Sequence, residues 1–186
     1  MRVVEIYARG GFLASVVMRP GEDWKEIATR TYAALLYPRT RSMRVWRIVP
    51  VDEHSWDLWF SVSSGEVHGE AFVSVSDQEE PAVGEPGTVE IWGPSGELMA
   101  TAALQPHVYW ETVAARLFAA LRQPLAVQRM RTRRDLSDDN ADLEDNANRV
   151  KFGIEHGAYD FEVIQKAIVR LNKPVGQAET GELDHH

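Results

Sequence analysis

Apolar and polar residues alternate near the start of the chain and then change to a helical spacing. Val4 and Ile6 are separated by polar neighbours, as in a half-buried strand, and residues 9–11 supply the glycines of a tight turn. From Trp24 onward, apolar residues recur at spacings of three and four, which is typical of a helix with one apolar face. The pattern predicts a β-hairpin followed by a helix that packs on it.

The same order of residue types recurs in the second half of the chain. Residues 4–35 match residues 89–121 in their apolar frame and in the order of glycine, proline and tryptophan, with Trp24 corresponding to Trp110. An ordered self-match of this kind favours an internal duplication of one supersecondary unit. The predicted fold class is therefore α+β, with two related ββα units, each an antiparallel or mixed sheet crossed by a helix.

Further elements follow each helix. Three strands are expected in the first unit, at residues 43–51, 55–63 and 67–76. Two strands are expected in the second unit, at residues 125–132 and 149–155. Residues 159–171 predict a C-terminal helix, whose apolar face consists of Phe161, Ile164, Ile168 and Leu171.

The composition suggests a division into two units. Residues 81–87 are rich in proline and glycine, which favours a linker. We expect the first unit at residues 1–80 and the second at residues 88–172, where it includes an acidic loop. The polar residues 173–186 predict a disordered tail.

A proline joins the predicted hairpin to the helix in both units, at residues 18–24 and 104–110. This hairpin–proline–helix order resembles the ubiquitin-like β-grasp fold, so the chain resembles a tandem of two such folds. The resemblance implies a non-catalytic binding or scaffold role. The three long strands of the first unit also suit other α+β layers, such as longin-like or roadblock-like sheets.

Composition narrows the classes of function. The 186 residues include no cysteine, which excludes disulfides, thiolate nucleophiles and thiolate metal sites. No apolar run is long enough for a signal peptide or a bilayer-crossing helix, so we expect a cytoplasmic protein that does not bind a membrane. The net charge of −8 disfavours general nucleic-acid binding and otherwise favours solubility. The duplication and the lack of catalytic motifs make a protein the expected partner. Homodimerisation stays open.

The chain lacks the common catalytic motifs. It contains neither a P-loop nor a G-x-G-x-x-G loop, so we assign no cofactor and no catalytic residue and favour a non-enzyme. His68 and His156, beside glycines, are the candidates for an acid or base if the chain is an enzyme. The acidic segment after residue 137 resembles a calcium loop in its alternation. Leu143 and Arg149 occupy the positions that need glycine and glutamate, so we assign no metal site.

Basic residues after the two helices are the candidate binding residues. They are Arg44, Trp46 and Arg47 in the first unit and Arg129, Arg131 and Arg133 in the second. Alternation in the second cluster would put three guanidinium groups on one face of a strand. Two such strips would suit an acidic peptide or a phosphate backbone, because guanidinium groups bind both through paired hydrogen bonds.

We therefore expect a non-catalytic protein-binding adaptor or inhibitor that acts through sheet faces and edges. One alternative is a nucleic-acid-related protein, which binds through its arginine strips or mimics nucleic acid with its acidic residues, as phage and plasmid inhibitors do. The other alternative is a small hydrolase-like enzyme with a histidine and carboxylate site in a cleft between the units.

Overall fold

The computed structural model describes residues 1–40, 42–62, 67–136 and 143–175. The first half contains β1 (Arg2–Ala8), β2 (Gly11–Val17), α1 (Trp24–Leu36), β3 (Arg44–Asp52), β4 (Ser55–Ser61) and β5 (Val67–Asp77). The second half contains β6 (Thr88–Trp92), β7 (Leu98–Ala103), α2 (Trp110–Arg122), the short 3-10 helix η1 (Pro124–Ala126), β8 (Met130–Arg134), β9 (Ala147–Glu155) and β10 (Phe161–Asn172).

These strands form a single antiparallel sheet in the order β3-β4-β5-β1-β2-β7-β6-β10-β9-β8. Strands β2 and β7 join the halves by pairing Ala14 with Ala102 and Val16 with Ala100. This pairing satisfies backbone groups that two separate sheets would leave exposed at their edges. The predicted α+β fold of two ββα units is therefore wrong, and neither an internal duplication nor a ubiquitin-like architecture is supported.

The predicted C-terminal helix is also wrong, because that segment forms strand β10 between β6 and β9. The pairing of β10 with β9 shifts register between Val163 and Gln165, which leaves Ile164 as an extra residue. This bulge interrupts the two-residue alternation and spaces the apolar residues as in a helix. Likewise, the strand expected at residues 125–132 begins only at Met130, after η1.

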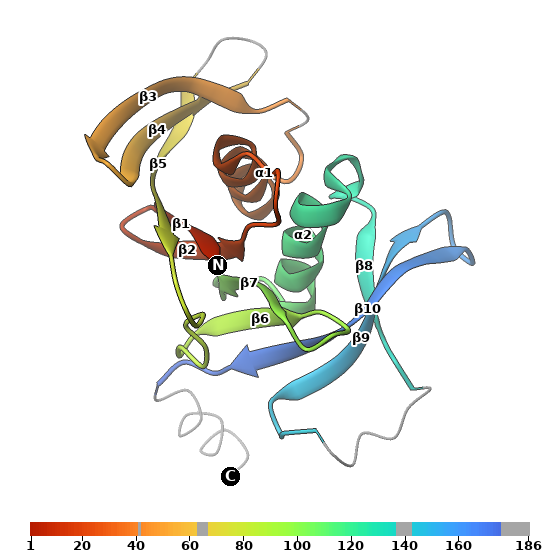
Figure 1. The fold of residues 1–186 in the computed structure, drawn as a ribbon. Coiled ribbons are helices and arrows are strands. Elements are labelled where there is room, and N and C mark those ends of the chain that lie inside the picture. The colour runs from red at the N-terminus through yellow and green to blue at the C-terminus, as the bar shows by residue number, and fades with distance from the viewer. Residues whose placement is uncertain (41, 63–66, 137–142, 176–186) are drawn as a thin grey trace.

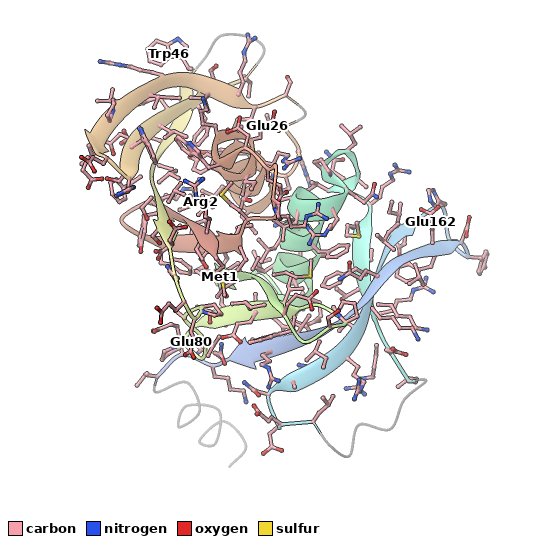
Figure 2. All side chains as sticks on the ribbon, in the orientation of Figure 1. Met1, Arg2, Glu26, Trp46, Glu80 and Glu162 are labelled. Atoms are coloured by element: carbon pink, nitrogen blue, oxygen red, sulfur yellow. The ribbon has the colours of Figure 1, made fainter. Side chains whose placement is uncertain are left out.

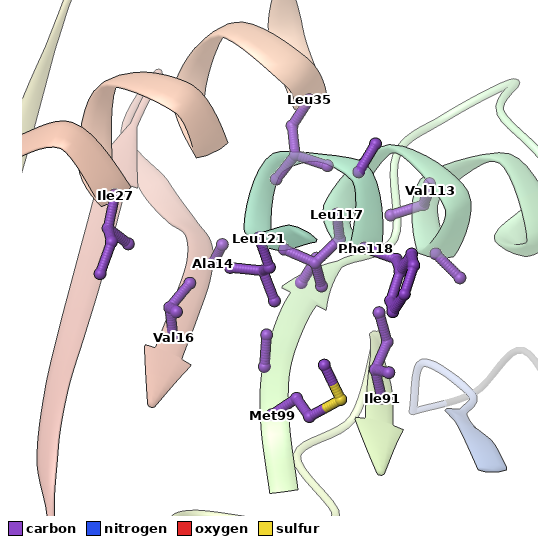
Figure 3. Close-up of a cluster of buried hydrophobic side chains, with 14 of the residues drawn as sticks. Ala14, Val16, Ile27, Leu35, Ile91, Met99, Val113, Leu117, Phe118 and Leu121 are labelled. Carbon is purple, nitrogen blue, oxygen red and sulfur yellow. The ribbon is translucent and has the colours of Figure 1, made fainter. Parts of the chain in front are cut away.

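The sheet curves around both helices, which lie against each other on its inner side (Figure 1). Helix α1 contacts β1, β2 and β3, and α2 contacts β6, β7 and β8. Figure 3 shows Leu117, Phe118 and Leu121 of α2 among the apolar side chains of the core. Because buried residues of both halves belong to one core cluster, the helices and the sheet stabilise each other.

The two helices lie where the apolar spacing predicts them, with tryptophans at their first residues. Both tryptophans pack against the common core, and Trp24 also stacks on Trp56 of β4 with ring centroids 4.2 Å apart. Neither helix of the described chain is long and apolar enough to cross a membrane.

The segment between β5 and β6 is tied to the outer face of the sheet by Glu90, which is only 1% exposed. The Glu90 carboxylate accepts hydrogen bonds from Gly84 N at 2.6 Å, Trp92 Nε1 at 3.0 Å and Asn172 Nδ2 at 2.8 Å. These three donors replace the water that a buried carboxylate loses. The division at residues 81–87 stays a prediction, and residues 176–186 of the predicted tail lie outside the described chain.

Candidate functional site

The two predicted arginine clusters lie at opposite edges of the sheet. Arg44, Trp46 and Arg47 belong to the edge strand β3, and Arg131 and Arg133 belong to the other edge strand, β8. Arg129 lies just before β8 and is not part of a strand. The structure therefore does not bring the two clusters together into one surface.

The β3 cluster is open to solvent. Trp46 is 57% exposed at a register shift of β3 and projects away from the molecule (Figure 2). The guanidinium carbon of Arg47 lies 5.4 Å from the ring centroid of Trp59 on β4. Arg47 is thus engaged in a cation–π contact within the sheet.

The β8 cluster does not form an open row of guanidinium groups. The guanidinium carbon of Arg133 lies 4.1 Å from the ring centroid of Phe161. Arg131 turns back to donate from Nη1 to the carbonyl oxygens of Gln128 and Met130, both at 2.8 Å. Its Nε also lies 3.6 Å from Glu155 Oε2. Arg131 and Arg133 are therefore each engaged with different groups of the protein and do not form the predicted strip.

The structure instead brings Arg131 together with two arginines from the helical layer. Arg39, which follows α1, and Arg116 of α2 line the same cavity of about 510 Å³ as Arg131. Glu111 is the carboxylate in this lining. We call Arg39, Arg116 and Arg131 the arginine triad.

The positive charge of the arginine triad is only partly compensated, because Glu155 pairs with Arg131 alone. Burial lowers the pKa of Arg116, and the positive charges of Arg131 and Arg39 lower it further. Within the described residues, neither Arg39 nor Arg116 forms an ion pair. An anion placed between these guanidinium groups would relieve their repulsion and form charge-assisted hydrogen bonds.

A second hollow of about 680 Å³ adjoins this cavity. The two hollows share Pro38, Val127 and Gln128, and the Gln128 Nε2 donates to the Pro38 carbonyl at 3.4 Å between them. The second hollow is lined mainly by apolar side chains, including Leu125, which is 98% exposed, and also by Arg30 and the predicted binding residue Arg129. Together the two hollows form a groove with a basic part and an apolar part.

Chemically, this groove is suited to binding. Guanidinium groups stay protonated at neutral pH, so the arginine triad cannot accept a proton from a substrate. Of the candidate histidines, His156 Nε2 lies 3.9 Å from Glu162 Oε2 on the β9–β10 hairpin, away from the groove lining. The side chain of His68 lies outside the described residues. In the described ranges, no cluster of three histidine, aspartate or glutamate side chains is suited to a metal ion.

The sequence indicated basic residues after the helices, but it did not single out Arg116. Arg116 lies within α2, where its position among buried alanines and leucines gives no sign of function. Only the packing of α2 beside residues 38–39 and β8 brings its guanidinium to Arg131.

Comparison with known proteins gives no relative: no family model, curated protein or solved structure matches the chain. The functional argument therefore depends on the geometry of the groove and on its charge.

Proposed function

We propose that the protein is a non-catalytic binding protein of the cytoplasm that recognises an acidic segment of a partner protein. The groove between α1, α2 and β8 is the recognition site. The observation that carries the proposal is the arginine triad, in which Arg39 and Arg116 share one cavity with Arg131 and have no ion pair within the described residues. Such guanidinium groups favour carboxylates, which they bind through paired hydrogen bonds.

A protein partner fits this site better than a nucleic acid does. The whole chain carries a net charge of −8. A nucleic acid is longer than the arginine triad, so its remaining phosphates would be repelled by the acidic surface around the triad. The apolar hollow beside the triad, with Tyr37, Met43 and Leu125, adds a surface for an aliphatic side chain. The favoured ligand is a segment in which acidic and aliphatic side chains are neighbours.

The sheet edges are less suited to backbone pairing with a partner strand. Strand β3 contains Pro50 and two register shifts, and β8 is short with three arginines. Proline, bulges and charged side chains are features that hinder strand addition at an edge. We therefore propose that partner contacts at the edges involve side chains such as Trp46 and Arg44.

The test uses a fluorescein-labelled acidic peptide, Gly-Glu-Leu-Glu-Leu-Glu-Gly, and its glutamine counterpart. Fluorescence anisotropy should show binding of the acidic peptide alone, and raising NaCl from 50 to 300 mM should weaken it, because salt screens exposed charges. The double variant Arg39→Gln with Arg116→Gln should bind at least tenfold more weakly.

The matched control removes two positive charges elsewhere, in Arg2→Gln with Lys25→Gln, and should keep the wild-type affinity. Equal binding of the glutamine peptide, or unchanged affinity in the groove variant, would overturn the proposal. Tighter binding of a single-stranded oligonucleotide than of the acidic peptide would replace it with nucleic-acid binding.

A further inference from the structure

The outer face of the sheet has a hollow of about 500 Å³ over β1, β4 and β5. The lining of this outer-face hollow includes the aromatic and acidic side chains Tyr7, Asp57, Trp59, Glu70 and Phe72, together with Arg9 from the β1–β2 turn. In the strand register, Phe72 of β5 lies opposite both Tyr7 and Asp57, and Trp59 lies opposite Glu70. Leu58 and Ala71, the neighbours in sequence, are buried toward α1, so these side chains point to the opposite side.

Aromatic rings and carboxylates therefore meet on one surface. The rings of Tyr7 and Phe72 have centroids 6.0 Å apart, and both side chains are half-buried. Aromatic faces attract cations through their quadrupole. Asp57 and Glu70 form no ion pair within the described residues, so their charge is available to a ligand.

Arg9 is part of the lining of the hollow and Arg47 contacts the Trp59 ring, but the guanidinium groups of both arginines are engaged with aromatic rings. Arg9 Nη2 donates to the Tyr37 hydroxyl at 3.2 Å, and its guanidinium carbon lies 5.6 Å from that ring centroid. Arg47 lies over Trp59 at 5.4 Å. The contact of Arg47 also demonstrates that Trp59 presents a face to which a guanidinium group binds.

We propose that the outer-face hollow binds the guanidinium group of an arginine side chain from a partner protein. A planar guanidinium stacks on an aromatic face and donates paired hydrogen bonds to a carboxylate, which an ammonium group does less well. The carboxylates of Asp57 and Glu70 supply the acceptors, and Tyr7 and Phe72 supply the aromatic walls. The site is independent of the arginine groove, because it lies on the opposite side of the sheet and has the opposite charge preference.

The test is an NMR titration of the ¹⁵N-labelled protein with the peptide Gly-Gly-Arg-Gly-Gly amide. A second peptide replaces arginine with citrulline, which has a similar shape but no charge. The arginine peptide should shift the amide signals of Asp57, Trp59 and Glu70, and the citrulline peptide should leave them unchanged. The variant Asp57→Asn with Glu70→Gln should bind the arginine peptide at least fivefold more weakly.

The matched control removes two exposed carboxylates outside the hollow, in Glu53→Gln with Asp77→Asn, and should retain wild-type affinity. A two-dimensional spectrum of each variant without peptide confirms that its fold is unchanged. Equal shifts from the citrulline peptide, or unchanged affinity in the hollow variant, would overturn the site. A lysine peptide that binds as tightly as the arginine peptide would overturn the preference for guanidinium.

Discussion

At the scale of single residues, the packing of Tyr32 against Gly69 places a sharp demand on the sequence. Tyr32 of α1 is 2% exposed and stacks on Phe60 with centroids 4.3 Å apart. Burial, followed by the effect of Tyr37, raises the pKa of Tyr32 to about 12, so its hydroxyl stays protonated at neutral pH. A Cβ added at Gly69 of β5 would overlap this hydroxyl. Position 69 therefore has to lack a side chain.

The substitution Gly69→Ala should lower the free energy of unfolding by about 1–3 kcal/mol, because the stacked ring of Tyr32 cannot move aside freely. Urea denaturation measures this change. Gly11→Ala is the matched control, since a Cβ there meets nothing within 4 Å, and should change stability by less than about 0.5 kcal/mol. Adding Tyr32→Phe to Gly69→Ala should restore part of the loss, and equal effects of Gly69→Ala and Gly11→Ala would contradict the described packing.

At the scale of elements, the two helices differ in how they begin. Asp23 precedes α1 and accepts a hydrogen bond from Lys25 N at 3.0 Å, which satisfies one of the free amides of the first turn. Tyr109 holds the corresponding position before α2, is 80% exposed and provides no such side-chain bond. The first turn of α2 is therefore the less completely capped of the two.

Substitutions at these two cap positions should change the free energy of unfolding in opposite directions. Asp23→Ala should lower the free energy of unfolding by about 1 kcal/mol. Tyr109→Ser should raise it by about 0.5–1 kcal/mol, because serine supplies the missing acceptor at an exposed position. Thermal unfolding followed by circular dichroism measures both effects. Asp23→Asn, which keeps a capping oxygen, should remain near wild type. A loss of stability in Tyr109→Ser would show that the tyrosine ring contributes more than the absent cap.

Elements with a regular local pattern could be predicted from the sequence, and elements that depend on distant partners could not. The stripe from Trp24 and the alternation around Val4 identify α1 and the first hairpin, because each repeats a single period. The bulge at Ile164 gave β10 the apolar spacing of a helix, and the sequence alone does not show this bulge because it is defined by the pairing with β9. For the same reason Arg116 showed no functional signal until α2 and β8 were placed together.

At the scale of the whole molecule, the central pairing of β2 with β7 is one of two features that link the unfolding of the two halves. Only three residue pairs join these strands, including Val16 with Ala100. The core is nevertheless continuous, because α1 contacts α2 and buried side chains of both halves form one cluster. The short pairing and the shared core therefore act together, and we expect them to make unfolding a single cooperative transition.

Native-state hydrogen exchange measures this cooperativity directly. The amides of Leu58 in β4 and Phe152 in β9 lie in opposite halves, and both should exchange with the same opening free energy as global unfolding. Ala100→Val should crowd the buried contact with Val16 and lower both values equally, by about 1–3 kcal/mol. If the two amides instead differ, or if the variant changes only one of them, residues 1–80 and 88–172 would behave as separate folding units. Equal values would mean that partner binding in the arginine groove stabilises β4 as much as β9, because both open only when the whole sheet does.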